Sequence, residues 1–246
     1  MPVDSSRIPV QAAPFEFDLP HFTQCLFGLG PVKIVALGSS TTAGEGGIVA
    51  YPYRLEALFR RDHARPMIDV INRGVGGEEA PAELRRFDQD VFPEKPSLVI
   101  WQVGTNSVWQ SPDQKPPSRA DTIRAVRDGI NRLRDAGGID VILMDPQYTP
   151  AMLTSDKEEA TGKMIAELAA LATEMKVNLF RRFELMQGWH TVERISLDRM
   201  VDPTDPTRLH DSDWTTQKIT EALYGLITAS VANTRAAKLA AQVRAS

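Results

Sequence analysis

Three short apolar segments, each typical of a buried strand, are followed directly by small or polar residues. These segments are residues 33–38, 67–72 and 98–103. Ser39 and Ser40 follow the first segment, a glycine-rich run from Gly74 to Gly77 follows the second, and Asn106 follows the third. Acyl transfer needs a nucleophile, a base, and hydrogen-bond donors directed at a developing oxyanion. A serine hydroxyl, a glycine N–H and an asparagine amide could supply the first and the last.

The base for such a site has to be a histidine or a carboxylate with a shifted pKa. The chain has four histidines. His21 falls in the amino-terminal segment, while His63 and His190 fall near the ends of predicted helices. His210 lies in a loop rich in proline and aspartate, just before the last predicted helix. It comes late enough in the chain to approach the same edge of the sheet, so His210 is the candidate base.

The elements that must position these residues alternate between strand and helix. Two further strands are predicted at 140–144 and 177–180, and apolar residues such as Ile123, Val126 and Ile130 recur at helical spacing between strands. This alternation implies a mainly parallel sheet with helices on both faces. We expect an α/β fold, a three-layer α/β/α sandwich of the flavodoxin-like type. Its five strands should have the order 2-1-3-4-5, so that the ends of the first three meet at one crevice.

Composition indicates one globular domain and argues against several functions. The chain has 246 residues, 42% hydrophobic and 24% charged, with a net charge of -4 and a single cysteine. The sequence has no basic stripe of the kind that binds nucleic acid. With one cysteine no intrachain disulfide can form, and no apolar run is long enough to span a membrane. We divide the chain into an N-terminal arm at 1–30, a main domain at 31–232 and a helical tail at 233–246.

The sequence predicts no metal and no organic cofactor. No group of histidine, cysteine and carboxylate residues has metal-ligand spacing, and the glycine-rich loops lack the Lys-Ser/Thr ending of a P-loop. The amino-terminal segment is rich in proline and contains no apolar signal core. As written, the chain is expected in the cytoplasm, or in the periplasm or outside the cell if a leader was removed. Its oligomeric state is not predicted.

Four segments, in this order along the chain, resemble the four sequence blocks of the SGNH (GDSL-type) serine hydrolases. They are Gly38-Ser39-Ser40-Thr41-Thr42, Asn72-Arg73-Gly74-Val75-Gly76-Gly77, Gly104-Thr105-Asn106 and Leu209-His210-Asp211-Ser212-Asp213-Trp214. The resemblance covers about residues 33–230. It implies that Ser40 is the nucleophile and His210 its base. It also implies that the oxyanion hole consists of the N–H groups of Ser40 and Gly77 and the side-chain amide of Asn106.

The resemblance departs from the family pattern at the acid that orients the histidine. This acid usually lies three residues before the histidine, where the chain has Thr207. A two-residue insertion could bring Asp205 into that place, with Pro206 stiffening the turn. Asp202 is the alternative acid, and a Ser–His dyad without a direct acid is the third interpretation. In addition, Ser39 replaces the usual aspartate before the nucleophile, which weakens the motif more than the mechanism.

Other charged residues flank these blocks. Asp145 ends the fourth predicted strand, where capping a helix or a turn is its expected role. Glu45, Glu78 and Glu79 lie beside the first two blocks and could touch substrate, although solvated loop charges are the simpler expectation.

The resemblance implies a serine esterase that hydrolyses a short-chain acyl ester, such as an O-acetyl group on a carbohydrate, or another small-molecule ester. Gly38, Ser39, Gly76 and Gly77 bring little side-chain bulk to the expected mouth of the site, which favours a small acyl group. An O-acyltransferase working through the same covalent intermediate is one alternative. A non-catalytic ligand-binding protein on the same fold is the other, because Thr207 stands where the acid is expected.

Overall fold

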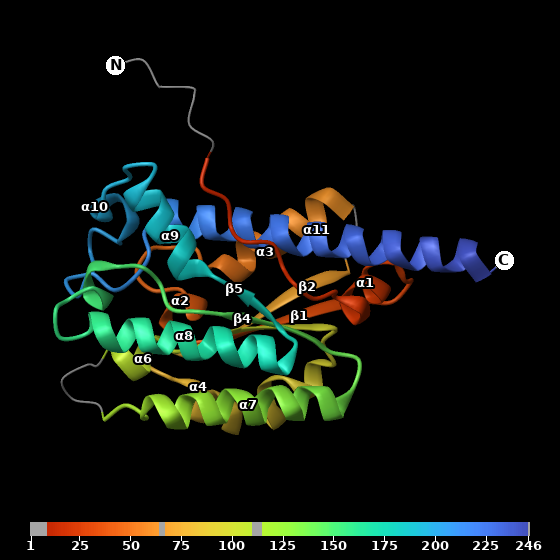
Figure 1. Cartoon of the computed structure of the whole chain (residues 1–246), viewed down its shortest axis with the longest axis horizontal. Coiled ribbons are helices and arrows are strands. Elements are labelled where there is room, and N and C mark those ends of the chain that lie inside the picture. Colours follow the sequence, from red (N-terminus) through yellow and green to blue (C-terminus); the bar gives the residue numbers. More distant parts are fainter. Residues whose placement is uncertain (1–8, 64–66, 110–114, 246) are drawn as a thin grey trace, which may run out of the picture.

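The core of the protein is a parallel β-sheet of five strands in the order β2-β1-β3-β4-β5 (Figure 1). The computed structural model describes residues 9–63, 67–109 and 115–245. The strands are β1 (Val32–Gly38), β2 (Ile68–Gly74), β3 (Leu98–Gln102), β4 (Asp140–Met144) and β5 (Asn178–Phe180). The predicted strands and their order are confirmed, and each neighbouring pair is parallel.

The central strands are buried on both faces, which explains their continuous apolar sequences. Side chains alternate along a strand, so Ile34 and Ala36 of β1 pack into one hydrophobic core while Val35 and Leu37 pack into the other. The same alternation sends the fully buried Trp101 of β3 into the second core.

Helices cover both faces of the sheet, as expected for three layers (Figure 1). The first face carries α1 (Pro20–Phe27), α3 (Tyr51–His63), α9 (Arg182–Thr191) and α11 (Asp213–Ala245). The second carries α4 (Ala80–Arg85), α5 (Phe87–Asp90), α7 (Arg119–Ala136) and α8 (Glu158–Met175). The short helices are α2 (Ser40–Ala43), α6 (Thr105–Val108) and α10 (Leu197–Met200), with 3-10 turns at Phe92–Glu94 and Pro150–Met152.

The first helix, α1, and the last, α11, both pack on the first face. Phe22 and Leu26 of α1 are buried in the core beside α3 and α11. Helix α11 runs without interruption through the boundary drawn at residue 232 and extends past the sheet (Figure 1). The division into arm, domain and tail stays a prediction.

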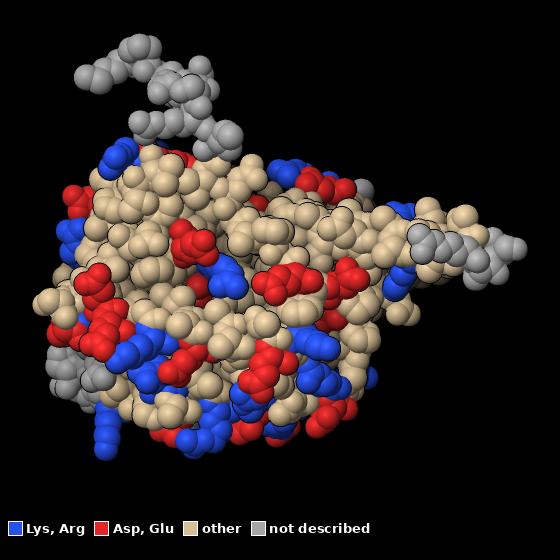
Figure 2. All heavy atoms as spheres, in the orientation of Figure 1, with Lys and Arg blue, Asp and Glu red and all other residues tan. Residues whose placement is uncertain are grey.

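Acidic and basic side chains are interspersed on the face shown in Figure 2. Ion pairs such as Arg119–Glu167 and Arg127–Glu174 join α7 to α8. Among the described residues, no helix is both long enough and apolar enough to cross a membrane.

Candidate active site

Ser40 lies where the chain leaves β1 and turns into the short helix α2. Gly38 makes this turn sterically feasible, because a Cβ at that position would lie 2.4 Å from Thr42 Oγ1 and 2.8 Å from Gln102 Oε1. Ser40 is 6% exposed, and its Oγ lies 3.1 Å from His210 Nε2. The turn therefore holds the hydroxyl at the carboxyl end of the sheet, in hydrogen-bond contact with the histidine.

Asp205 contacts the other ring nitrogen of His210. Its Oδ2 lies 2.8 Å from His210 Nδ1 and also accepts the N–H groups of Leu209 and His210, each at 2.9 Å. Partial burial opposes ionisation, but hydrogen bonds from the Thr207 hydroxyl and from the backbone of His210, Thr207 and Leu209 hold the pKa of Asp205 well below its usual range. The carboxylate is thus charged and fixed against the ring.

The two other residues considered at the acid position have different partners. Asp202 Oδ1 accepts the Thr204 N–H and hydroxyl, both at 2.8 Å, so it stabilises a local turn. The Asp202 N–H donates to the His210 carbonyl at 2.9 Å. Thr207 donates its hydroxyl to Asp205 Oδ1 at 2.6 Å. The threonine at the usual acid position therefore supports the carboxylate that contacts His210.

The glycine-rich segment after β2 passes close to the nucleophile turn. A Cβ on Gly74 would lie 2.1 Å from the Ala43 nitrogen, and a Cβ on Gly76 would lie 3.9 Å from Ser40 Cβ. Gly77 has a φ of +77°, in the left-handed region that glycine adopts without strain. These glycines allow the backbone of one loop to approach Ser40 closely, which a donor N–H at Gly77 requires.

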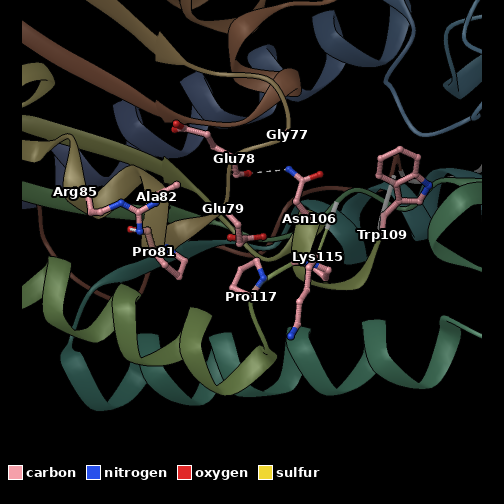
Figure 3. A pocket seen from close by; sticks show the side chains of 11 residues that line it. Gly77, Glu78, Glu79, Pro81, Ala82, Arg85, Asn106, Trp109, Lys115 and Pro117 are labelled. Carbon is pink, nitrogen blue, oxygen red and sulfur yellow. Dashed lines mark hydrogen bonds between the residues drawn. The ribbon is translucent and has the colours of Figure 1, made fainter. Parts of the chain in front are cut away.

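Asn106 lies in the short helix α6, which follows β3, and contacts the segment after β2. Its Nδ2 donates to the Glu78 carbonyl at 2.8 Å, the contact drawn as a dashed line in Figure 3. A side-chain amide carries two N–H donors, so this contact uses one of them. The structure thus gathers Ser40, Gly77, Asn106, His210 and Asp205 at one edge of the sheet.

Glu45 departs from the expectation of a solvated loop charge. Its Oε2 lies 3.0 Å from His210 Nε2, although the side chain is 42% exposed. Its Oε1 lies beside Gly76, where a Cβ would come within 2.9 Å. The carboxylate consequently occupies space directly in front of the serine–histidine pair. Glu45 stands among glycines in the sequence, at Gly44, Gly46 and Gly47, and nothing in that segment predicts a contact with His210.

Glu79 also contradicts that expectation, since it is 4% exposed. Its Oε1 accepts the N–H groups of Ala80 and Gly104 at 2.9 and 2.8 Å, and its Oε2 accepts that of Ser107 at 3.2 Å. Only its place between two of the blocks could have drawn attention to it.

A buried chain of polar side chains joins the blocks and was missed in the sequence. Gln102 Oε1 accepts the Ser39 N–H at 3.1 Å, and its amide donates to Thr105 Oγ1 at 3.3 Å. Thr105 Oγ1 donates to Gln147 Oε1 at 3.0 Å, and Gln147 Nε2 donates to the Leu209 carbonyl at 3.1 Å. The signal available was a glutamine at the end of an otherwise apolar strand.

Asp145 caps a helix, as expected. Its Oδ1 accepts the Phe183 N–H at the start of α9 at 3.0 Å. Burial raises the pKa of Asp145 to about 7, although Arg182 nearby opposes the shift. Arg182 is fully buried, donates Nη2 to Gln147 Oε1 at 2.8 Å, and has Nη1 3.6 Å from Asp211 Oδ2. This group supports the loop that carries His210.

Two cavities adjoin these residues. One cavity, of about 370 Å³, is bordered by Gly77 and Asn106 and also by Trp109 and Lys115 (Figure 3). The other, of about 20 Å³, lies between Ser40, His210 and Ile48. No group of three or more metal-ligating side chains occurs in the described part of the chain.

Solved structures share this architecture. An acetylxylan esterase from Geobacillus stearothermophilus superposes with a TM-score of 0.65 at 20% identity, covering 81% of this chain and 95% of its own. A lipase/acylhydrolase from Enterococcus faecalis gives a TM-score of 0.65 at 19% identity, covering 80% of this chain and 95% of its own. At these identities the likeness concerns the fold.

The sheet order and the helices on both faces define the SGNH-type hydrolase fold that these structures share. Within that class of fold the chain belongs to the non-GDSL lipase-like family, whose model matches residues 5–233. It is also 30% identical over 91 residues to the uncharacterized lipoprotein YqeF of Bacillus subtilis (strain 168). That match spans 36% of this chain and 37% of the relative.

Proposed function

We propose that the protein is a serine esterase that hydrolyses a short-chain acyl ester through an acyl-enzyme on Ser40. The observation that carries the proposal is the unbroken contact from Ser40 Oγ to His210 Nε2, at 3.1 Å, and from His210 Nδ1 to Asp205 Oδ2, at 2.8 Å. In this role His210 takes the serine proton as the hydroxyl attacks the ester carbonyl, and Asp205 stabilises the imidazolium that results.

The oxyanion formed by this attack is held by the N–H groups of Ser40 and Gly77 and by the Asn106 amide. Loss of one donor of this kind typically costs about 10²–10³ in rate. His210 then returns its proton to the leaving alcohol. A water molecule, activated by the same nitrogen, hydrolyses the acyl-enzyme and restores Ser40.

An acetyl or similarly small acyl group suits the space around the nucleophile. The cavity that touches both Ser40 and His210 has a volume of only about 20 Å³, whereas the larger one beyond Asn106 offers about 370 Å³ for the alcohol part of the ester. The structurally similar acetylxylan esterase has catalytic mutants at a serine, a histidine and an aspartate. We therefore propose acetylated carbohydrate as the substrate class.

The contact of Asp205 with His210 favours catalysis over the alternative of a ligand-binding protein. That alternative arose because Thr207 stands where the acid is expected. Thr207 instead donates to Asp205, which lies against the ring.

The mechanism is tested with a short-chain aryl ester and an organophosphonate that labels active serines. Ser40→Ala and His210→Ala should each abolish hydrolysis, and the wild type should form one adduct on Ser40 that neither variant forms. Retained turnover in both variants would contradict the mechanism, and absence of the adduct in the wild type would favour the ligand-binding alternative.

An alcohol acceptor such as a sugar, added to the assay, tests for acyl transfer. If the acyl group is transferred to this acceptor rather than to water, the protein is an acyltransferase instead.

A further inference from the structure

The two loops that carry the oxyanion donors come from strands that are not neighbours. In the order β2-β1-β3, strand β1 separates β2, which leads to Gly77, from β3, which leads to Asn106. Ser40 follows β1 and lies between them. Backbone pairing within the sheet therefore does not set the distance between Gly77 and Asn106. That distance depends on direct contacts between the two segments past the carboxyl end of β1.

The adjacent residues Glu78 and Glu79 provide that connection. The Glu78 carbonyl accepts Asn106 Nδ2 at 2.8 Å, and the Glu79 carboxylate accepts the N–H groups of Gly104 and Ser107 at 2.8 and 3.2 Å. Both acceptors belong to the segment after β2, and all three donors belong to the segment after β3. Figure 3 shows Glu78, Glu79 and Asn106 together at the side of the larger cavity.

The hydrogen bonds of Glu79 are those of an ionised carboxylate. Its oxygens accept three backbone N–H groups, including that of Ala80 at 2.9 Å. Burial raises the pKa of Glu79 too, but hydrogen bonds from the backbone of Gly104, Ala80 and Ser107 oppose that shift. Burial and the nearby charge of Glu79 raise the pKa of Glu83, one turn along α4, well above the usual value. Glu83 Oε2 accepts Trp101 Nε1 at 2.6 Å, and its Oε1 has no hydrogen-bond partner among the described residues. The charge of this buried pair thus resides on Glu79.

We propose that Glu79 is a positioning residue of the oxyanion hole, which sets the position of the Asn106 amide relative to the Gly77 N–H. This inference rests on the proposed esterase function. Donors in such a site must be in place before the reaction, and a displacement of about 1 Å can cost roughly 10² in rate. The Glu79 carboxylate accepts the N–H groups of Gly104 and Ser107, which flank Asn106, so it acts through the backbone of residues 104–107.

The test compares Glu79→Gln with Glu83→Gln, the same substitution at a buried carboxyl of the same segment. Glu79→Gln places an N–H₂ group against a backbone N–H, so one hydrogen bond between the carboxylate and residues 104–107 is lost. Glu83→Gln replaces a neutral carboxyl group by a neutral amide. We expect kcat on a short-chain aryl ester to fall about 10- to 100-fold in Glu79→Gln with little change in KM. Glu83→Gln should keep a kcat close to that of the wild type.

A double-mutant cycle with Asn106→Ala separates positioning from a general loss of structure. If Glu79 acts through the amide, the double variant should be no slower than Asn106→Ala alone. Glu79→Asp, which keeps the charge on a shorter side chain, supplies a second variant, and thermal unfolding of each confirms that it folds. Equal kcat values for Glu79→Gln and Glu83→Gln, or fully additive losses in the cycle, would overturn the proposal.

Ser40→Ala, assayed beside these variants, distinguishes the two conclusions. Turnover that persists in Ser40→Ala overturns the proposed mechanism, and the role of Glu79 with it. Loss of turnover in Ser40→Ala together with a wild-type kcat in Glu79→Gln overturns the positioning role alone.

Discussion

Glu45 Oε2 lies 3.0 Å from His210 Nε2, the nitrogen that also lies 3.1 Å from Ser40 Oγ. With Nδ1 bonded to Asp205, a neutral His210 presents a lone pair at Nε2, which accepts the serine proton but repels a carboxylate. The Glu45 contact is favourable only when Nε2 or Glu45 carries a proton. Glu45 thus stabilises a form of the site in which Ser40 is not activated.

Replacement of Glu45 by alanine should increase activity. The variant removes a carboxylate that lies against the same nitrogen of His210 as Ser40 Oγ. Partly exposed ion pairs contribute up to about 1 kcal/mol, so we expect kcat/KM on a short-chain aryl ester to rise up to about fivefold. Steady-state kinetics of both proteins measure the change. A loss of activity in the variant would show that Glu45 supports the site instead.

Asp205→Asn should reduce kcat by about 10⁴, because an amide at this place favours the wrong tautomer of the histidine. Asp202→Asn is the matched control, since Asp202 bonds to Thr204 rather than to the His210 ring. It should retain most of the activity. Steady-state kinetics of the two variants decide between the two acids, and a larger loss in Asp202→Asn would reverse the assignment.

Asp145 should make the fold less stable as pH rises from about 4 to 7. A carboxyl in the unfolded chain ionises near pH 4, whereas burial raises the pKa of Asp145 to about 7 in the folded protein. Its stabilising contribution is therefore complete below pH 4 and is lost as pH rises to about 7. Asp145→Asn retains Oδ1 as acceptor for Phe183. Urea unfolding at several pH values should show the variant gaining stability relative to the wild type over this range, whereas a constant difference would contradict the assignment.

Gly74→Ala should destabilise the fold and the site together. A Cβ there would lie 2.1 Å from the Ala43 nitrogen and 2.6 Å from the Thr42 carbonyl carbon, so β2 and α2 would have to separate. We expect a loss of about 3 kcal/mol or more in the free energy of unfolding. Gly162→Ala in α8, where a Cβ meets nothing within 4 Å, should instead stabilise the protein by about 0.5–1 kcal/mol. Thermal unfolding of both variants measures the contrast.

The sequence by itself determined the strands, their order and the residues placed at their ends. Short apolar runs bounded by Gly38, Gly74 and Gly104 are local signals, and a parallel α/β sheet brings such strand ends to one edge. His210 could be selected among the four histidines by its place in the chain, and Ser40 rather than Ser39 by the resemblance of its segment to the nucleophile block of the SGNH hydrolases. These features depend on residue type and spacing along the chain.

Only the tertiary structure decided which carboxylate lies against His210 and which one joins two loops. Asp205 rather than Asp202 contacts His210 because the loop folds back on itself, with Arg208 at a φ of +57° and its N–H bonded to the Asp205 carbonyl. Glu79, expected in solvent, is buried because N–H groups from a loop on another strand surround it. The sequence does not tell whether water or backbone N–H groups solvate a carboxylate. For Glu79 the N–H groups belong to a segment 25 or more residues away along the chain, so only the folded structure shows them.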